Sequence, residues 1–338
     1  MNRLRTILVA VLASALFAFA AGTTPDSSKV ETPPDTSKAA IAPGSSFHIT
    51  HNHVFTLLGV LITHHGLRNS ETLHNWPFFS IGAPALSSTT KLQKDFSKLL
   101  TVTGDANASL TPVNVGATLG TDLQLIHLLE AGVKGSVSSA WNYGRTSTFM
   151  GVYDPEERTF DQDIFMTEAA FSITYKAGLS IPLMMFLPKS DWTKIILKVG
   201  VSRETSTYTG ASDGEPWKAG TDTRVNGDRG ELSGTLMYIL PFERLYMAMV
   251  TVKASRFMHE YEFDKIYWEY DPKFLMVGVT PTVMFKMMEN WNGMVMAPIM
   301  RERKFNKRRY ESNEELMLKR VGAEWHLNAV MCMVNYVF

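Results

Sequence analysis

The sequence has a single cysteine, Cys332, among its 338 residues. One thiol cannot form a disulfide within the chain, which excludes a disulfide-stapled fold. The sequence also lacks an excess of either charge, since 33 basic residues balance 33 acidic ones. Proteins that bind nucleic acid usually carry a basic excess or patch, so the composition argues against nucleic acid as the main partner.

Long apolar runs are missing beyond the first twenty residues. The mean hydropathy is −0.05 and 20% of the residues are charged, which is too polar for a helical membrane protein. The one such run, residues 7–19, follows Arg3 and Arg5 and ends at a small-x-small site closed by Ala20. We therefore expect residues 1–20 to be a cleaved signal peptide. An uncleaved anchor is the alternative, but the run is short for ~30 Å of hydrocarbon.

The next stretch, residues 21–46, is rich in proline, serine, threonine and lysine. It offers little to bury, so the sequence predicts a disordered polar leader in the periplasm. A spacer is the simpler interpretation, and a barrel plug or a contact with the cell wall is the alternative. The remaining residues, 47–338, form the expected folded domain.

From residue 110 onward, apolar and polar residues alternate. In residues 194–204, for example, Ile195, Leu197 and Val199 share one face, and Lys198 lies on the other. Strand side chains alternate in this way. Similar segments predict strands at residues 113–125, 133–143, 165–176, 229–240 and 275–287. The polar face carries true charges, which a dry core would not accept unpaired.

Connections of alternating length separate these segments. Short ones are expected near residues 128–131, 188–191, 241–244 and 290–293, and long ones at residues 151–163, 205–228, 262–271 and 304–314. Short periplasmic turns and longer outer loops are typical of membrane barrels. We predict an all-β, antiparallel, up-and-down transmembrane β-barrel with about 10 strands, 8 or 12 being the alternatives. A soluble exported β-protein with a half-buried sheet would give the same alternation.

Several stretches depart from this pattern. Residues 55–62 are apolar on both faces, which fits a buried strand or a short helix, and residues 92–100 have helical spacing. Residues 245–258 are also apolar on both faces. In the last segment the apolar face switches sides, which requires a β-bulge near residues 328–330.

The C-terminal segment alternates aromatic and apolar residues. Val334, Tyr336 and Phe338 share one face and end the sequence. With the signal peptide and the alternating strands, this ending resembles bacterial outer-membrane β-barrel proteins. The resemblance implies that these three residues form the closing strand's membrane-insertion signal. It also implies the outer membrane of a Gram-negative-type bacterium, with membrane lipid and the barrel-insertion machinery as partners.

The polar faces place charged residues inside such a barrel. The candidates are Lys134, Glu168, Lys176, Lys194, Lys198, Arg229, Glu231, Arg320 and Glu324. In a narrow barrel such charges pair and fill the interior, and this structural role is the simpler interpretation. Charged walls that select small solutes in a narrow passive channel are the alternative.

Other chemistries have weaker support. An outer-membrane acyl hydrolase remains an alternative, but the sequence shows no Gly-x-Ser-x-Gly and no fixed spacing of serine and histidine, which favours a non-enzymatic role. His51 and His53 share a strand face and are weak metal candidates, because no carboxylate or cysteine completes their spacing. We expect no cofactor.

Two further compositional features have simple interpretations. The basic run at residues 301–309 is a solvated loop end or a site for lipopolysaccharide phosphates. The nineteen methionines most simply coat the lipid-facing wall, among them Met184, Met185, Met247, Met249, Met287, Met288, Met294 and Met296.

Overall fold

We describe a computed structural model of the chain over residues 47–62, 78–81, 84–97, 99–126, 128–141, 150–160, 166–188, 190–219, 222–258, 262–306, 314–327 and 329–337. The expected signal peptide and leader lie outside these ranges. Within them, no helix has both the length and the apolar character needed to cross a membrane.

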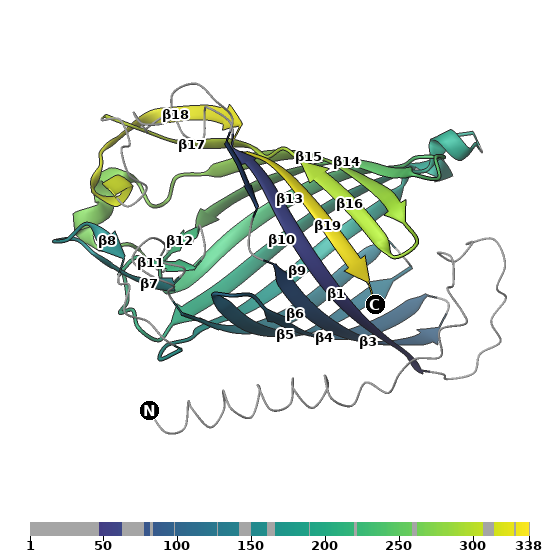
Figure 1. Cartoon of the computed structure of the whole chain (residues 1–338), viewed down its shortest axis with the longest axis horizontal. Coiled ribbons are helices and arrows are strands. Elements are labelled where there is room, and N and C mark those ends of the chain that lie inside the picture. The colour runs from purple at the N-terminus through teal and green to yellow at the C-terminus, as the bar shows by residue number, and fades with distance from the viewer. Residues whose placement is uncertain are drawn as a thin grey trace.

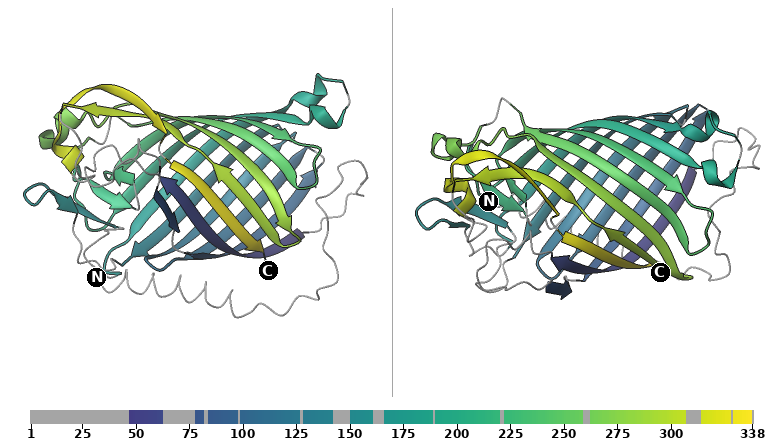
Figure 2. Two further views of the ribbon diagram at one scale, coloured as in Figure 1. Left: turned by 45° about the horizontal axis from the view of Figure 1, so that its top comes forward. Right: turned by 90° about the horizontal axis from the view of Figure 1, so that it is seen from above.

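A closed antiparallel barrel of twelve strands forms the body of the molecule (Figures 1 and 2). Its wall consists, in chain order, of β1 (Phe47–Ile62), β3 (Ala85–Ser97), β4 (Leu100–Leu110), β5 (Asn114–Leu125), β6 (Leu129–Ala140), β9 (Ala170–Pro182), β10 (Ile195–Tyr208), β13 (Gly227–Ile239), β14 (Leu245–Phe257), β15 (Met276–Met288), β16 (Trp291–Met296) and β19 (Ala329–Val337). Neighbours in the wall are mostly neighbours in sequence, and β1 pairs with β19 to close it. The all-β barrel prediction is confirmed, and so is the role of the C-terminal segment as closing strand.

The expected number of about ten strands is too low by two. Six of the nine wall strands from β5 to β19 match the segments predicted from the alternation, but residues 47–110 contribute three wall strands instead of one. Residues 92–100, with their helical spacing, belong to β3 and the start of β4. The outward face of β3 mixes Ser88, Thr90 and Lys94 with Leu86 and Leu92, so the alternation of this strand is weak.

The connections predicted to be short lie at one end of the barrel, and those predicted to be long lie at the other. At the first end, short turns join β3 to β4, β5 to β6, β13 to β14 and β15 to β16, whereas β9 and β10 are joined by the longer segment 183–194. At the other end, the connection between β4 and β5 is short as well, at residues 111–113. The β9–β10 turn holds the single-turn helices η1 (Leu183–Met185) and η2 (Asp191–Thr193). The long connections after β6, β10 and β14 all leave from the other end. We call these the turn end and the loop end.

The loop end carries a second, smaller sheet. It is built from β7 (Met150–Asp154), β8 (Thr159–Phe160), β11 (Trp217–Ala219) and β12 (Asp222–Arg224), which come from two different loops. These strands lie at the left end of the barrel in Figure 1, as do β17 (Ile299–Phe305) and β18 (Arg320–Leu327). The short helices η3 (Lys265–Tyr270) and η4 (Glu314–Met317) also belong to the loop-end segments.

Buried hydrophobic side chains gather in these loops and at the adjoining strand ends, not in the barrel wall. One cluster stacks Tyr208 on Trp217 at a ring-centroid distance of 5.2 Å and includes Met150. The other packs Tyr153, Phe160, Val225, Phe263, Tyr267, Tyr270, Phe305 and Leu316. The segment predicted to be a long outer loop, residues 205–228, therefore contributes to both hydrophobic cores.

The alternation distinguishes an outer from an inner face of the wall. Exposed apolar side chains recur on one face, among them Leu119, Val133, Ile173, Val199, Val201, Leu232, Leu236, Val250, Val252 and Val283. Strand pairing places each next to a residue of the same face, as in Val201↔Leu232. On most wall strands the opposite face holds serines, threonines and charged residues. An apolar outer face and a polar inner face are what a barrel in lipid requires.

The face switch in the last segment has the expected cause. Met296 of β16 pairs with Met331 of β19, whereas Ile299 of β17 pairs with Leu327 of β18. Between these two pairs the chain advances three residues from Met296 to Ile299 but four residues from Leu327 to Met331. One extra residue is therefore inserted between β18 and β19. This bulge turns Tyr336 and Val334 to the same outer face as Trp325. β2 (Phe78–Ile81) pairs only with the last residues of β1.

The assignment of faces can be tested with two adjacent pairs of the β4–β5 ladder. Leu119 is 70% exposed on the outer face, and Asn107 lies on the inner face. We expect Leu119→Arg to lower the free energy of unfolding in lipid vesicles by up to ~2–4 kcal/mol, the cost of a lipid-facing arginine near the bilayer midplane.

The matched variant Asn107→Arg should cost much less, because its side chain enters the wet interior. Urea unfolding followed by the heat-dependent shift in electrophoretic mobility measures both variants. Equal losses, or a larger loss for Asn107→Arg, would contradict the assignment of faces.

Candidate functional site

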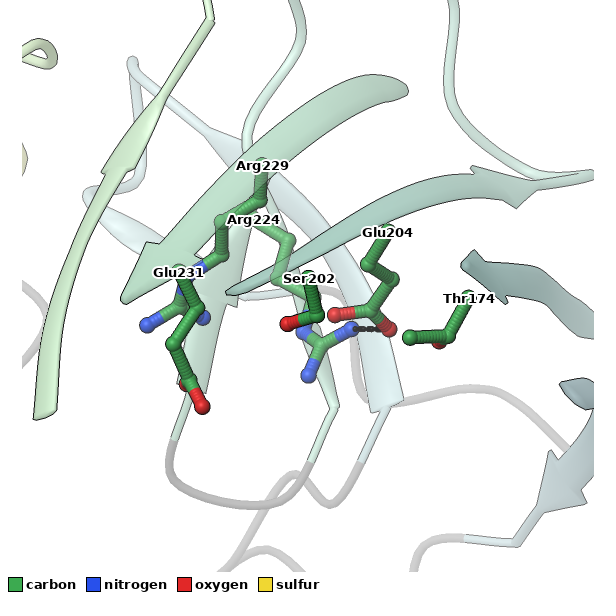
Figure 3. Close-up of a pocket in the computed structure, with 6 residues that line it drawn as sticks. All are labelled: Thr174, Ser202, Glu204, Arg224, Arg229 and Glu231. Carbon is green, nitrogen blue, oxygen red and sulfur yellow. Dashed lines mark hydrogen bonds and ion pairs between the residues drawn. The ribbon is translucent and has the colours of Figure 1, made fainter. Parts of the chain in front are cut away.

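A polar cavity of about 350 Å³ lies inside the barrel near the loop end (Figure 3). Its lining comes from three neighbouring wall strands and one loop strand: Thr174 of β9, Ser202 and Glu204 of β10, Arg229 and Glu231 of β13, and Arg224 of β12. The five wall residues share the inner face, because Thr174 pairs with Glu204, Glu204 with Arg229, and Ser202 with Glu231. The positions of these five residues therefore follow directly from the period-two alternation of strand side chains.

Arg224 comes from the small loop sheet rather than from the wall. Its Nη1 lies 2.8 Å from Glu204 Oε1, and both side chains are about three-quarters buried (dashed line in Figure 3). This ion pair ties the loop sheet to the inner face of β10. A loop side chain therefore reaches the inner face of the wall at this level.

The residues that follow Arg224 hold it in place. Val225 is fully buried in the larger loop core. The side chain of Asn226 accepts a hydrogen bond from the Tyr208 N–H at 2.7 Å and donates one to the Ala211 carbonyl at 2.8 Å. The hydroxyl of Tyr208 donates to the carboxylate of Glu168. Because these groups are buried or half-buried, the position of Arg224 is fixed by packing as well as by charge.

The other charges of the cavity are also paired. Glu231 Oε1 lies 3.0 Å from Lys253 Nζ, and the Arg229 guanidinium donates to Ser255 Oγ at 3.0 Å. The lining thus contains two arginines and two glutamates, so its formal charge is balanced. Such a site can offer both hydrogen-bond donors and acceptors to a polar solute without a strong preference for one sign of charge.

A second ion pair spans β6 on the inner face of the wall. Lys176 Nζ of β9 lies 2.9 Å and 3.0 Å from the two carboxylate oxygens of Asp122 on β5. The residue between them in the ladder is Gly132. Two strand spacings, roughly 9–10 Å, separate β5 from β9. The pair can form because glycine leaves the space above β6 empty.

The structure places the predicted charged residues in three settings. Lys134, Lys176, Lys198, Arg229 and Glu231 lie on inner faces of wall strands. Glu168 precedes β9 at the loop end, where it contacts Tyr208, and Lys194 lies in the turn before β10, 3.2 Å from Asp191. These residues are not brought together into one cluster.

The remaining two, Arg320 and Glu324, lie on β18 beyond the closed wall. Arg320 Nε is 2.7 Å from Asp271 Oδ2, and Glu324 pairs in register with Glu302. Arg224 was missed altogether, because no period-two pattern exists in its loop. The aromatic residues Tyr208 and Trp217 in an otherwise polar loop are the signal that could have indicated a packed segment there.

The histidine candidates lie on the outer face of β1. His51 Nδ1 is 2.9 Å from Thr90 Oγ1 of β3. Nowhere in the described ranges do three histidine, cysteine, aspartate or glutamate side chains converge as metal ligands would. Among the other histidines and serines that an acyl hydrolase could use, His64, His65 and Ser70 fall outside those ranges, as does Phe338 of the C-terminal signal. Val334 and Tyr336 face outward, with Tyr336 4.9 Å from Trp291 between ring centroids.

Solved structures of similar shape include several barrels. An outer-membrane channel from Pseudomonas putida F1 aligns over 91% of this chain and 100% of its own, with a TM-score of 0.41 and 9% identity. The CymD monoaromatic hydrocarbon channel aligns over 85% and 87%, with a TM-score of 0.38 and 10% identity. The translocator domain of the autotransporter NalP from Neisseria meningitidis aligns over 87% and 89%, with a TM-score of 0.36 and 7% identity. No family model and no curated protein matches the sequence.

These likenesses are low in both score and identity, and the architecture of this chain is established by its own strand pairing. Twelve antiparallel strands close on themselves around a polar interior. The chain thereby resembles bacterial outer-membrane β-barrel proteins in architecture, as the sequence indicated.

The glycine between Asp122 and Lys176 yields a stability prediction. A Cβ at Gly132 would collide with Asp122 Oδ1 and lie 2.8 Å from Lys176 Cε. We expect Gly132→Ala to lower the free energy of unfolding by roughly 1–3 kcal/mol, the usual cost of overpacking. Gly135→Ala on the same strand is the control, since its Cβ would have no neighbour closer than 4.0 Å. Urea unfolding in vesicles compares them, and a harmless Gly132→Ala would show that the ion pair is not held over β6.

The larger loop core yields a prediction about pH. Burial raises the pKa of Tyr267 to about 12, helped by the nearby Tyr153 and Asp264. An unfolded tyrosine loses its proton near pH 10, so the native state binds one more proton than the open state above that pH. This contribution to the stability of the loop core is present below pH 10 and is lost as pH rises toward 12.

Limited proteolysis of the loops between pH 9 and 12 measures this effect. Cleavage should accelerate above pH 10 in the native protein, and Tyr267→Phe should shift that acceleration to higher pH. Identical profiles for the two proteins would show that Tyr267 does not control the opening of the loop core.

Proposed function

We propose that this protein is a channel of the bacterial outer membrane through which small polar solutes diffuse passively. The closed barrel with an apolar outer face and a polar inner face supports this proposal. The turn end faces the periplasm and the loop end faces the outside, because short turns are typical of the periplasmic side. Membrane lipid covers the outer face, and the outward residues Val334 and Tyr336 serve, together with Phe338, as the signal for the insertion machinery.

The cavity next to Arg224 is the observation that carries the proposal. A barrel that served only as an anchor would need no polar space inside, whereas a channel needs a constriction that contacts its solute. Here the constriction is formed by the Arg224–Glu204 pair and the neighbouring Arg229 and Glu231. Because guanidinium and carboxylate groups face the same space, hydroxyl-rich or zwitterionic solutes fit better than strongly charged ones.

The channel function predicts how the constriction controls current. In planar bilayers the native protein should show discrete conductance steps. Arg224→Ser removes both the bulk and the positive charge at the constriction, so we expect a larger conductance and a reversal potential shifted toward cation selectivity. The shift should shrink at high salt, where exposed charges are screened.

The matched control is Lys319→Ala, which removes a lysine from an exposed loop ion pair, 3.5 Å from Glu269, that does not line the cavity. Its conductance and selectivity should equal those of the native protein. A native protein that folds into vesicles but gives no conductance steps would refute the channel function. Equal effects of the two substitutions would instead show that Arg224 does not form the constriction.

A further inference from the structure

One part of the inner wall is apolar rather than polar. Eight of the nineteen methionines lie there, on five neighbouring strands: Met237 of β13, Met247 and Met249 of β14, Met284 of β15, Met294 and Met296 of β16, and Met331 and Met333 of β19. We call this set the methionine belt. The sequence interpretation had assigned Met247, Met249, Met294 and Met296 to the lipid-facing wall, and strand register shows that this is wrong.

The register joins the belt into one continuous ladder. Met247 pairs with Met284, Met284 with Met294, and Met294 with Met333. Two further pairs lie beside this row, Met237↔Met249 and Met296↔Met331. Directly opposite residues have Cβ atoms roughly 4.5–5.5 Å apart, so the side chains of neighbouring strands touch.

The outward positions of the same strands confirm which way the belt faces. Val250 and Val283 alternate with belt residues and are 41% and 38% exposed on the outer face. The alternation was ambiguous in the sequence because residues 245–258 are apolar on both faces. Neighbouring strands resolve it: Thr235 pairs with Thr251 on the polar face, and Met249 is two residues from Thr251.

Polar groups border the belt on both sides. Toward the loop end, the hydroxyls of Thr235 and Thr251 lie 3.1 Å apart. Within the belt itself, the buried Thr282 lies between Met249 and Met296. Toward the turn end, Asn292 pairs with Asn335, whose side chain accepts a hydrogen bond from Thr56 at 2.8 Å. The belt is thus a bounded apolar strip in an otherwise hydrophilic interior.

Aliphatic residues extend the strip at its two ends. Met247 pairs with Ile239 of β13, and Met333 pairs with Leu58 of β1. Isoleucine and leucine cannot ligate a metal ion, but they do extend an apolar surface. The common property of all ten side chains is therefore hydrophobicity, which favours an organic ligand over a soft metal ion such as Cu⁺. Unbranched thioether side chains also adapt to ligands of different shape.

We propose that the methionine belt binds the apolar part of a small amphipathic organic solute as the solute crosses the barrel. Its polar part then faces the opposite wall, where Asp122, Lys134 and Lys176 line β5, β6 and β9. This inference rests on the proposed channel function and narrows its substrate class. Contact on one side only gives weak binding, which a channel needs so that the solute can leave.

The test compares two sugar derivatives that differ only in their apolar group. Methyl glucoside and phenyl glucoside are both too polar to cross lipid quickly, so their entry into protein-loaded vesicles reports on the channel. We expect phenyl glucoside to reach half-maximal influx at a concentration on the order of tenfold lower, as a partly desolvated ring allows. Met284→Gln with Met294→Gln should abolish this difference, because glutamine has a similar length but is polar.

Two control variants separate the explanations. Met284→Leu with Met294→Leu keeps the apolar surface without sulfur and should retain the preference for phenyl glucoside. Met287→Gln with Met184→Gln alters exposed methionines outside the belt and should change nothing. Folding of every variant is checked by the heat-dependent mobility shift.

Each contrary outcome has a distinct meaning. If methyl glucoside enters but phenyl glucoside shows no preference, the belt does not bind apolar groups, although the channel function stands. If neither glucoside enters, the channel function fails and the inference fails with it. If the leucine variant loses the preference as completely as the glutamine variant, hydrophobicity is not the recognised property. Binding of Ag⁺ to the native protein, but not to the leucine variant, would then identify a thioether site for soft cations.

Discussion

Closure of the hydrogen-bonded ladder is the constraint on which the rest of the structure depends. β19 pairs with β1 on one side and with β16 on the other, and β14 pairs with β15. The wall strands therefore satisfy one another's backbone groups, which a spanning sheet in lipid must do because no water is available there. Once the ladder is closed, every side chain faces either outward or inward, and the two faces can meet two different solvents.

Closure also explains which strands could be predicted from the sequence. Six of the nine strands from β5 to β19 alternate clearly, because their outer residues are mostly apolar and most of their inner residues are polar: β5, β6, β9, β10, β13 and β15. β3 does not alternate clearly, since Thr90 and Lys94 lie on its outer face. The spacing of its leucines is also typical of a helix. The bulge before β19 could be inferred in advance, because a switch of the apolar face has no other economical cause in a strand that must continue.

The candidate site likewise combines residues that the alternation predicts with one residue that it does not. The wall residues Arg229 and Glu231 could be placed inside the barrel from alternation alone. Arg224 could not, because its position depends on contacts between loops far apart in sequence. Trp217 pairs with Val152 of another loop and stacks on Tyr208, and this packing directs β12 toward Glu204. The period-two alternation predicts which residues of a strand face inward. It cannot predict the constriction, because the constriction arises from tertiary packing of the loops.

The wall from β3 to β10 is polar on its inner face, whereas the wall that carries the methionine belt is apolar there. Polar inner residues need water or partners, and the wall from β3 to β10 supplies partners, as the Lys176–Asp122 pair shows. The methionine belt has neither need, and its residues are half-buried against one another. A one-residue slip of β14 would turn Met247 and Met249 outward and Val250 inward while leaving both faces apolar. Local hydrophobicity therefore cannot fix this strand, and the polar pairs Thr235–Thr251 and Lys253–Glu231 hold its register instead.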